Sequence, residues 1–101
     1  MSLERDIRMA IETGKVIIGS ERTLKELKGG DLKLVIVANN CPENIKADIE
    51  YYAKISKTPV YRFDGTNRDL GVLSGKPFNI SVMGIKEAGE SNILKRLTEV
   101  S

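Results

Sequence analysis

The segment LKLVIVA, residues 32–38, decides the fold class of this chain. It is rich in β-branched side chains and almost wholly apolar, a pattern typical of a central strand that is covered on both faces. Three further short apolar segments, residues 16–18, 60–63 and 80–85, are predicted to be strands as well. A sheet that is buried on both sides needs one layer of helices above it and another below it.

Segments with helical periodicity separate these strands. Helices are predicted at residues 3–13, where apolar side chains recur every three or four positions, and at residues 91–97. Ser20 is predicted to cap a second helix, which Gly29 and Gly30 close.

Two more helices follow the central strand. Pro42 suits the first turn of one of them, and Thr66 and Asp69 have the spacing of a capping box that opens a short one. Five helices therefore alternate with four strands. We predict an α/β protein, a three-layer α/β/α sandwich with a four-stranded mixed sheet, in a single domain of residues 1–101.

The composition excludes several kinds of site. The chain has one cysteine, Cys41, and no histidine. An internal disulfide, a structural zinc site with Cys and His ligands, and catalysis by a histidine base are therefore excluded. We expect no metal, no cofactor and no enzyme activity.

The N-terminal segment and the charge pattern bear on location and partners. Residues 1–15 are rich in charge where a signal peptide would be apolar, and no apolar run reaches the roughly 20 residues that span a bilayer. We therefore expect a cytoplasmic protein without membrane contact. The net charge is +2, with both signs mixed along the chain, so the composition permits RNA binding but does not show it.

The first candidate binding segment runs from Gly19 to Lys25, at a strand-to-helix turn. Backbone N–H groups at a helix N-terminus attract anions, and Arg22 and Lys25, one turn apart, can reach the same phosphate. A serine cap with solvated charges explains the same residues and is the simpler interpretation.

Two more candidate loops follow strands. Asn39 and Asn40 end the central strand, where their amides can read base edges or simply form a turn. Cys41 is expected near a helix N-terminus, where a thiol pKa can fall, but it has no partner for redox or nucleophilic chemistry. After the third strand, Asn67 and Arg68 remain free to face a ligand.

Phe78 makes the loop 75–79 the most informative of these candidates. It follows Lys76 and Pro77, and an aromatic ring beside a cation suits stacking on an unpaired RNA base. It can equally be the first core residue of the last strand.

An acidic metal site is the hypothesis from a different class. Asp64 and Asp69 suggest a receiver-type pocket, but that pocket needs carboxylates at the end of the first strand, where Gly19 and Ser20 stand. The phosphate-binding Walker pattern and the dinucleotide glycine pattern are also missing from the sequence.

Together these segments resemble the archaeal and eukaryotic large-subunit ribosomal protein L-thirty-e family, within the L-seven-Ae superfamily of kink-turn RNA binders. The matching segments run in order over nearly the whole chain. They are TGK (13–15) with Gly19, LKLVIVANNCP (32–42), DIEYYAKIS (48–56), PVYRFDGTNRDLG (59–71), GKPF (75–78) and EAGESNIL (87–94).

The resemblance implies a structural component of the large ribosomal subunit that binds a kink-turn or related internal loop of ribosomal RNA. It also implies contact with neighbouring ribosomal proteins and a monomer when the protein is free. The residues that match the family's RNA-binding surface are Gly19, Ser20, Arg22, Lys25, Asn40, Lys46, Asn67, Phe78, Asn79 and Ser81.

Different roles are implied for these residues, and one position departs from the family. Asn40 and Phe78 match base-contacting positions, whereas Lys25 and Lys46 match basic positions that contact the RNA backbone. Glu21 stands where family members often carry a basic residue, which casts doubt on base recognition by that turn. The alternative function is a stand-alone RNA- or protein-binding module of the same superfamily that acts outside the ribosome.

Overall fold

The computed structural model describes residues 3–95, which form four helices and four strands followed by the helical residues 93–95. In chain order the elements are α1 (Leu3–Thr13), β1 (Lys15–Ile18), α2 (Ser20–Lys28), β2 (Leu34–Val37), α3 (Glu43–Ser56), β3 (Val60–Arg62), α4 (Asn67–Leu73) and β4 (Val82–Glu87). The helix predicted at residues 91–97 lies partly outside the described residues. No helix between residues 3 and 95 is long and apolar enough to cross a bilayer.

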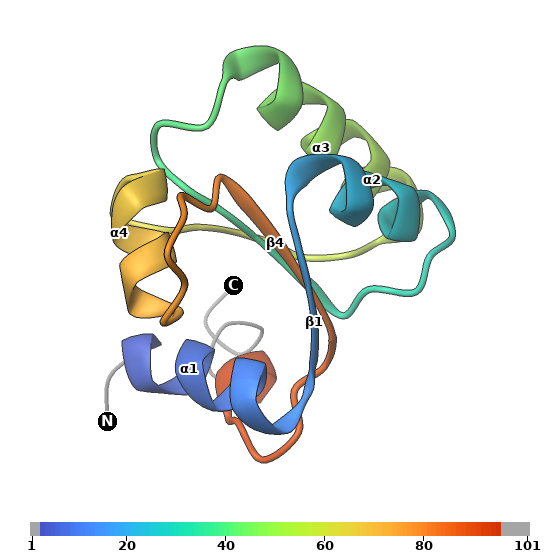
Figure 1. Ribbon diagram of the computed structural model, residues 1–101. Coiled ribbons are helices and arrows are strands. Elements are labelled where there is room, and N and C mark those ends of the chain that lie inside the picture. Colours follow the sequence, from blue (N-terminus) through green and yellow to red (C-terminus); the bar gives the residue numbers. More distant parts are fainter. Residues whose placement is uncertain (1–2, 96–101) are drawn as a thin grey trace.

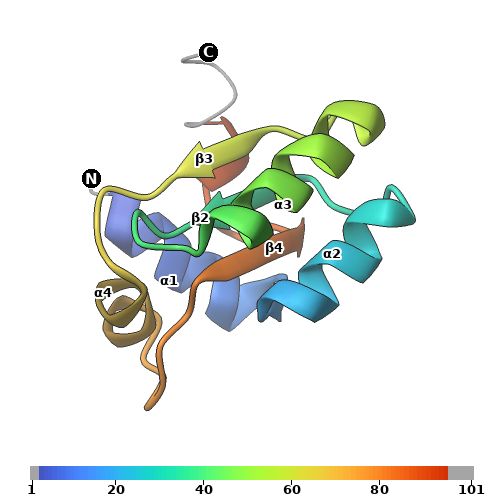
Figure 2. The same cartoon turned by 90° about the horizontal axis from the view of Figure 1, so that it is seen from above.

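The four strands form one mixed sheet in the order β1-β4-β2-β3. β4 pairs antiparallel with both β1 and β2, whereas β2 and β3 are parallel. β1, β2 and β3 therefore run in the same direction and β4 runs against them. Helices α2 and α3 cover one face of this sheet, and α1 and α4 cover the other (Figures 1 and 2). The predicted α/β sandwich with a four-stranded mixed sheet is confirmed.

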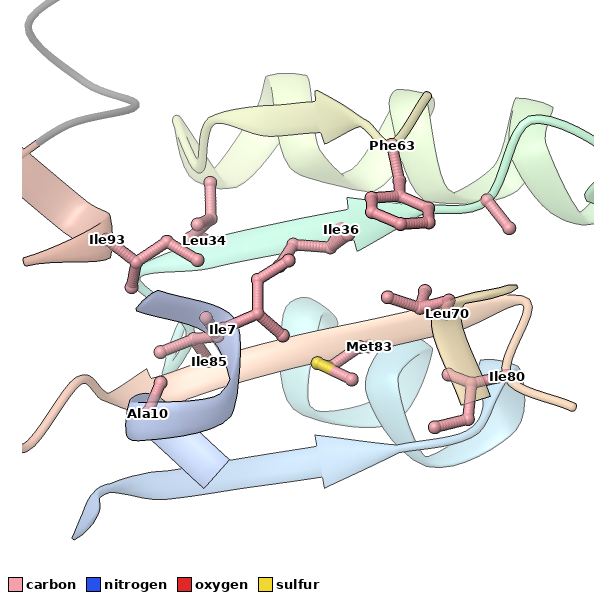
Figure 3. Close-up of a cluster of buried hydrophobic side chains, with 11 residues drawn as sticks. Ile7, Ala10, Leu34, Ile36, Phe63, Leu70, Ile80, Met83, Ile85 and Ile93 are labelled. Carbon is pink, nitrogen blue, oxygen red and sulfur yellow. The ribbon is translucent and has the colours of Figure 1, made fainter. Parts of the chain in front are cut away.

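Burial of β2 on both faces divides the core into two clusters. Its four residues are all buried, and successive side chains of a strand point to opposite faces. Leu34 and Ile36 pack on the α1 side with Phe63 and Met83 (Figure 3). Val35 and Val37 pack on the other side with residues of α2 and α3. Residues 32–38, which predict a strand covered on both faces, therefore contain the strand that separates the two clusters.

The helix starts agree with the sequence in one case and differ in two. Thr66 and Asp69 form the predicted capping box at α4. The prediction that Ser20 caps α2 is wrong: Gly19, with φ 109°, occupies the cap position and no side chain caps this helix. A glycine adopts that backbone conformation without strain. Helix α2 therefore begins at Ser20, one residue earlier than a Ser20 cap would place it. Pro42 likewise precedes α3 as its cap residue rather than lying in its first turn.

Candidate nucleic-acid interface

One end of the sheet gathers loops that lie far apart in the sequence. The carboxyl ends of β1, β2 and β3 meet there with the segment that leads into β4. Backbone hydrogen bonds tie these loops together: Gly19 N–H donates to the carbonyl of Val82 (3.0 Å), and Asn39 N–H donates to that of Gly65 (2.8 Å). We call this end of the molecule the loop face.

Three polar side chains of the loop face form a continuous network. The backbone N–H of Asn67 donates to Oδ1 of Asn40 (2.7 Å), and Nδ2 of Asn40 donates to Oδ1 of Asn67 (3.2 Å). Nδ2 of Asn67 donates in turn to the Ser81 hydroxyl (3.4 Å). The Asn40–Asn67–Ser81 network thus joins the segments that follow β2 and β3 to the segment that precedes β4.

Phe78 projects from the loop face with 52% of its surface exposed. Of the two interpretations of this residue, the exposed loop position is correct and the core position is wrong. The reason is a close approach of backbones: a Cβ added to Gly71 in α4 would lie 2.1 Å from the carbonyl oxygen of Phe78. The main chain at Phe78 therefore rests directly on α4, while Ile80, two residues later, fills the core beneath.

A groove of about 660 Å³ runs between the start of α2 and the segment before β4. The predicted residues that line it are Gly19, Ser20, Arg22, Phe78, Asn79 and Ser81. Lys76 also lines the groove but is missing from the predicted set, although its place beside Phe78 in the sequence was a usable signal. The groove therefore has an aromatic ring on one wall and two cations within its lining.

A second groove, of about 590 Å³, lies between α2 and α3 and shares Gly19, Ser20 and Arg22 with the first. Glu21 lines this second groove and not the first. The carboxylate that departs from the family pattern is thus directed away from the groove that contains Phe78.

The remaining predicted cations lie outside the first groove. Lys25 is exposed on α2, and Lys46 is half-buried on α3. Neither of them, nor Arg22, has a salt-bridge partner among the described residues. All three ammonium and guanidinium groups are therefore available to an anionic ligand.

Cys41 has no features of a reactive thiol. Its side chain is buried with 6% of its surface exposed. Burial raises its pKa above the ordinary value of 9.0, and this effect outweighs the nearby Lys46. Cys41 lies next to the cap residue of α3, as expected, but its pKa does not fall there because desolvation of the thiolate dominates. Among residues 3–95 there is also no group of three or more acidic, Cys or His side chains that could hold a metal ion.

The sequence profile of one protein family matches residues 1–95, and it is described as the Ribosomal protein L7Ae/L30e/S12e/Gadd45 family. The chain belongs to this family. It is 52% identical to the "Large ribosomal subunit protein eL30" of Methanosphaera stadtmanae over 94% of this chain and 97% of the relative. It is 50% identical to the protein of the same name from Methanothermobacter thermautotrophicus, with the same coverage.

A solved structure of a protein of unknown function from Bacillus halodurans is similar in fold. Its TM-score is 0.83 at 24% identity, and the match covers 97% of each chain. At that identity the likeness bears on the fold alone.

Proposed function

We propose that this protein is a structural component of the large ribosomal subunit and that its loop face binds a kink-turn or related bent internal loop of ribosomal RNA. Relatives of about 50% identity over nearly the whole chain carry the name of a large-subunit protein. On this proposal the protein is a monomer when free, and on the cytoplasmic ribosome it lies among neighbouring ribosomal proteins.

The observation that carries the proposal is an exposed aromatic ring, on a loop whose backbone packs against α4, beside a polar network and a cationic groove. Phe78 stays half exposed in water although a core residue lies two positions away. A bent internal loop offers what this arrangement fits, namely unpaired bases that stack on an aromatic ring and phosphates that draw together at the bend.

The contacts divide into two groups by their effect. Arg22, Lys25 and Lys46 contact phosphates and fix the position of the protein, whereas Asn40 and Phe78 contact bases and select the site. With a net charge of only +2, binding depends on the shape of the loop and on few contacts more than on bulk electrostatics.

A comparison of two RNAs tests the proposal. Gel-shift titrations of the wild-type protein are carried out with a kink-turn RNA and with a straight duplex of the same length. We expect much tighter binding to the kink-turn RNA. Phe78→Ala lowers that affinity by about 5- to 150-fold, the range for loss of one base–aromatic stack, and Asn40→Ala also weakens it, while both variants change duplex binding little.

Val72→Ala is the matched control. Val72 is an apolar side chain of α4 that is 68% exposed but lines neither groove, so its removal leaves RNA affinity unchanged. An equal loss on both RNAs for Phe78→Ala and Asn40→Ala contradicts the assignment of these residues to base recognition.

A further inference from the structure

The directions of the hydrogen bonds in the Asn40–Asn67–Ser81 network follow from one unambiguous donor. A backbone N–H can only donate, so the atom of Asn40 that lies 2.7 Å from the nitrogen of Asn67 is the amide oxygen. The amide nitrogen of Asn40 is then the atom that donates to Oδ1 of Asn67. With its oxygen in that position, Asn67 has its nitrogen toward Ser81 and donates to the hydroxyl.

The directions of these three hydrogen bonds determine which donors and acceptors of the network remain available to a ligand. Both amide oxygens accept within the network, and the Ser81 oxygen accepts from Asn67. Each amide nitrogen keeps a second hydrogen and Ser81 keeps its hydroxyl hydrogen. None of these hydrogens has another partner among the described residues. The network therefore keeps three unused donor hydrogens, one on each residue, and one spare lone pair on each of its three oxygens.

The middle residue of the network is held rigidly. Asn67 is the first residue of α4 and lies within the capping box, directly after its N-cap residue Thr66. Its carbonyl also accepts from the N–H of Ile80 (2.9 Å). The main chain at Asn67 is thus fixed from both sides, so its N–H holds the orientation of the Asn40 amide.

We infer that Asn67 is a positioning residue that sets the polarity of the network, so that the loop face presents hydrogen-bond donors and binds an acceptor group of the RNA. This inference rests on the proposed function and specifies the chemistry of the same face. The acceptor is either a phosphate oxygen or an acceptor atom on a base edge.

Asn40→Asp tests the polarity with almost no change of shape. One carboxylate oxygen still accepts from the N–H of Asn67, while the other now faces Oδ1 of Asn67 in place of a donor. The Asn67 amide turns over to donate to Asp, its oxygen then faces Ser81, and the Ser81 hydroxyl donates inward. The substitution thereby reverses the two bonds between side chains and keeps the bond from the backbone N–H of Asn67, at a residue that is exposed.

The expected result is coupling between Asn40 and Ser81, which share no hydrogen bond. Ser81→Ala lowers the affinity of the wild-type protein for kink-turn RNA by about 2- to 13-fold, the range for one hydrogen bond. In the Asn40→Asp background the same substitution has no further effect, because the hydroxyl hydrogen is already directed inward. With Asn67→Ala as background, Asn40→Asp and Ser81→Ala act additively, since the link between them is missing.

Substituted RNAs identify the acceptor. Kink-turn RNAs that carry single methylphosphonates remove charged phosphate oxygens. Base analogues that each lack one acceptor, such as 7-deazapurines for N7, remove the acceptors on the base edges one at a time. The modification that weakens the wild-type protein but not Asn40→Ala marks the partner of Asn40. If no modification of either kind behaves in this way, Asn40 has no acceptor partner and the inference is wrong.

The outcomes separate this inference from the proposed function. If the wild-type protein does not prefer kink-turn RNA to duplex, the proposed function fails. If that preference holds but Asn40→Asp binds as well as wild type, or Ser81→Ala costs the same in both backgrounds, the polarity of the network is wrong. Circular dichroism verifies that each variant is folded. If Asn40→Asp does not fold, a cycle of Asn40→Ala and Ser81→Ala replaces it: Asn40→Ala releases the Asn67 amide, so Ser81→Ala should then cost less affinity than in wild type, and an equal cost overturns the inference.

Discussion

Gly71 and Phe78 illustrate how single residues shape the loop face. Gly71 is buried in α4, and its missing side chain leaves the space in which the main chain of Phe78 passes. The backbone of Phe78 contacts α4 at Gly71, and its ring remains half exposed. A residue with no side chain thereby determines the exposure of an aromatic one.

Gly71→Ala is predicted to disturb both stability and binding. The added Cβ would lie 2.1 Å from a backbone oxygen, and neither main chain can yield without shifting the loop. We expect a loss of about 1–3 kcal/mol in the free energy of unfolding, measured by urea denaturation, and weaker binding to kink-turn RNA.

Gly29→Ala is the control for that substitution. Gly29 has φ −80°, and the nearest atom to its added Cβ is 3.4 Å away. Its free energy of unfolding changes little. If Gly71→Ala is as stable as Gly29→Ala, the close approach does not constrain the loop.

At the scale of elements, the start of α4 links local structure to the interface. The capping box of Thr66 and Asp69 fixes the first turn of α4. Asn67 lies in this turn, directly after Thr66, and its backbone N–H donates to the side chain of Asn40. A helix of seven residues is too short to be stable alone. Its cap and its packing therefore determine how precisely the network is held.

Thr66→Ala is predicted to affect stability and RNA binding together. Loss of the cap lowers the free energy of unfolding by about 0.5–2 kcal/mol. It also loosens Asn67, so affinity for kink-turn RNA falls while the residues that contact RNA stay unchanged. Thr66→Ser keeps the hydroxyl and should retain both properties in urea denaturation and gel-shift measurements. If Thr66→Ala is less stable but binds kink-turn RNA as tightly as wild type, the cap of α4 does not contribute to RNA binding.

The same element shows what the sequence could predict and what it could not. The spacing of Thr66 and Asp69 is a local signal, and it predicted the cap correctly. The bond between Asn40 and Asn67 joins residues 27 positions apart, so it depends on how β2 and β3 pair. Both residues were candidates, but no local pattern indicates that they touch or in which direction they donate.

Other differences have equally local causes. Ser20 was assigned the cap of α2 because hydroxyls favour that position, yet the positive φ of Gly19 decided the turn. Phe78 had two possible environments in the sequence, because whether its ring is buried depends on the approach of α4. By contrast, the apolar composition of residues 32–38 can be read from the sequence alone. It predicts a strand that is covered on both faces, and such a strand favours a sandwich fold.

At the scale of the whole molecule, positive and negative charges nearly balance, and the net charge is only +2. Paired charges such as Arg62 with Glu50 (2.6 Å) and Lys86 with Glu26 (3.3 Å) are neutralised within the protein. The three cations that we assign to phosphates are not among these pairs. The salt dependence of RNA binding should therefore reflect a small number of contacts.

We predict a slope of log affinity against log salt of about −2 to −3, since each phosphate contact contributes about 0.7–0.9. Lys25→Ala should reduce the magnitude of the slope by about that amount, in titrations from low to moderate salt. Lys54→Ala is the control, because Lys54 lies in the last turn of α3, away from the loop face. A steep slope that both substitutions change equally would indicate diffuse electrostatic binding instead.

The central place of β4 has a consequence for how the protein is made. β4 is the last strand between residues 3 and 95, yet it separates β1 from β2 in the sheet. While the chain is being synthesised, β1 has no neighbour to pair with until residues 82–87 have left the ribosome that makes them. Ser81, which completes the polar network, emerges just before that strand. The complete loop face therefore forms only after synthesis has passed β4, and on the proposed function binding of RNA to the complete face starts at that point.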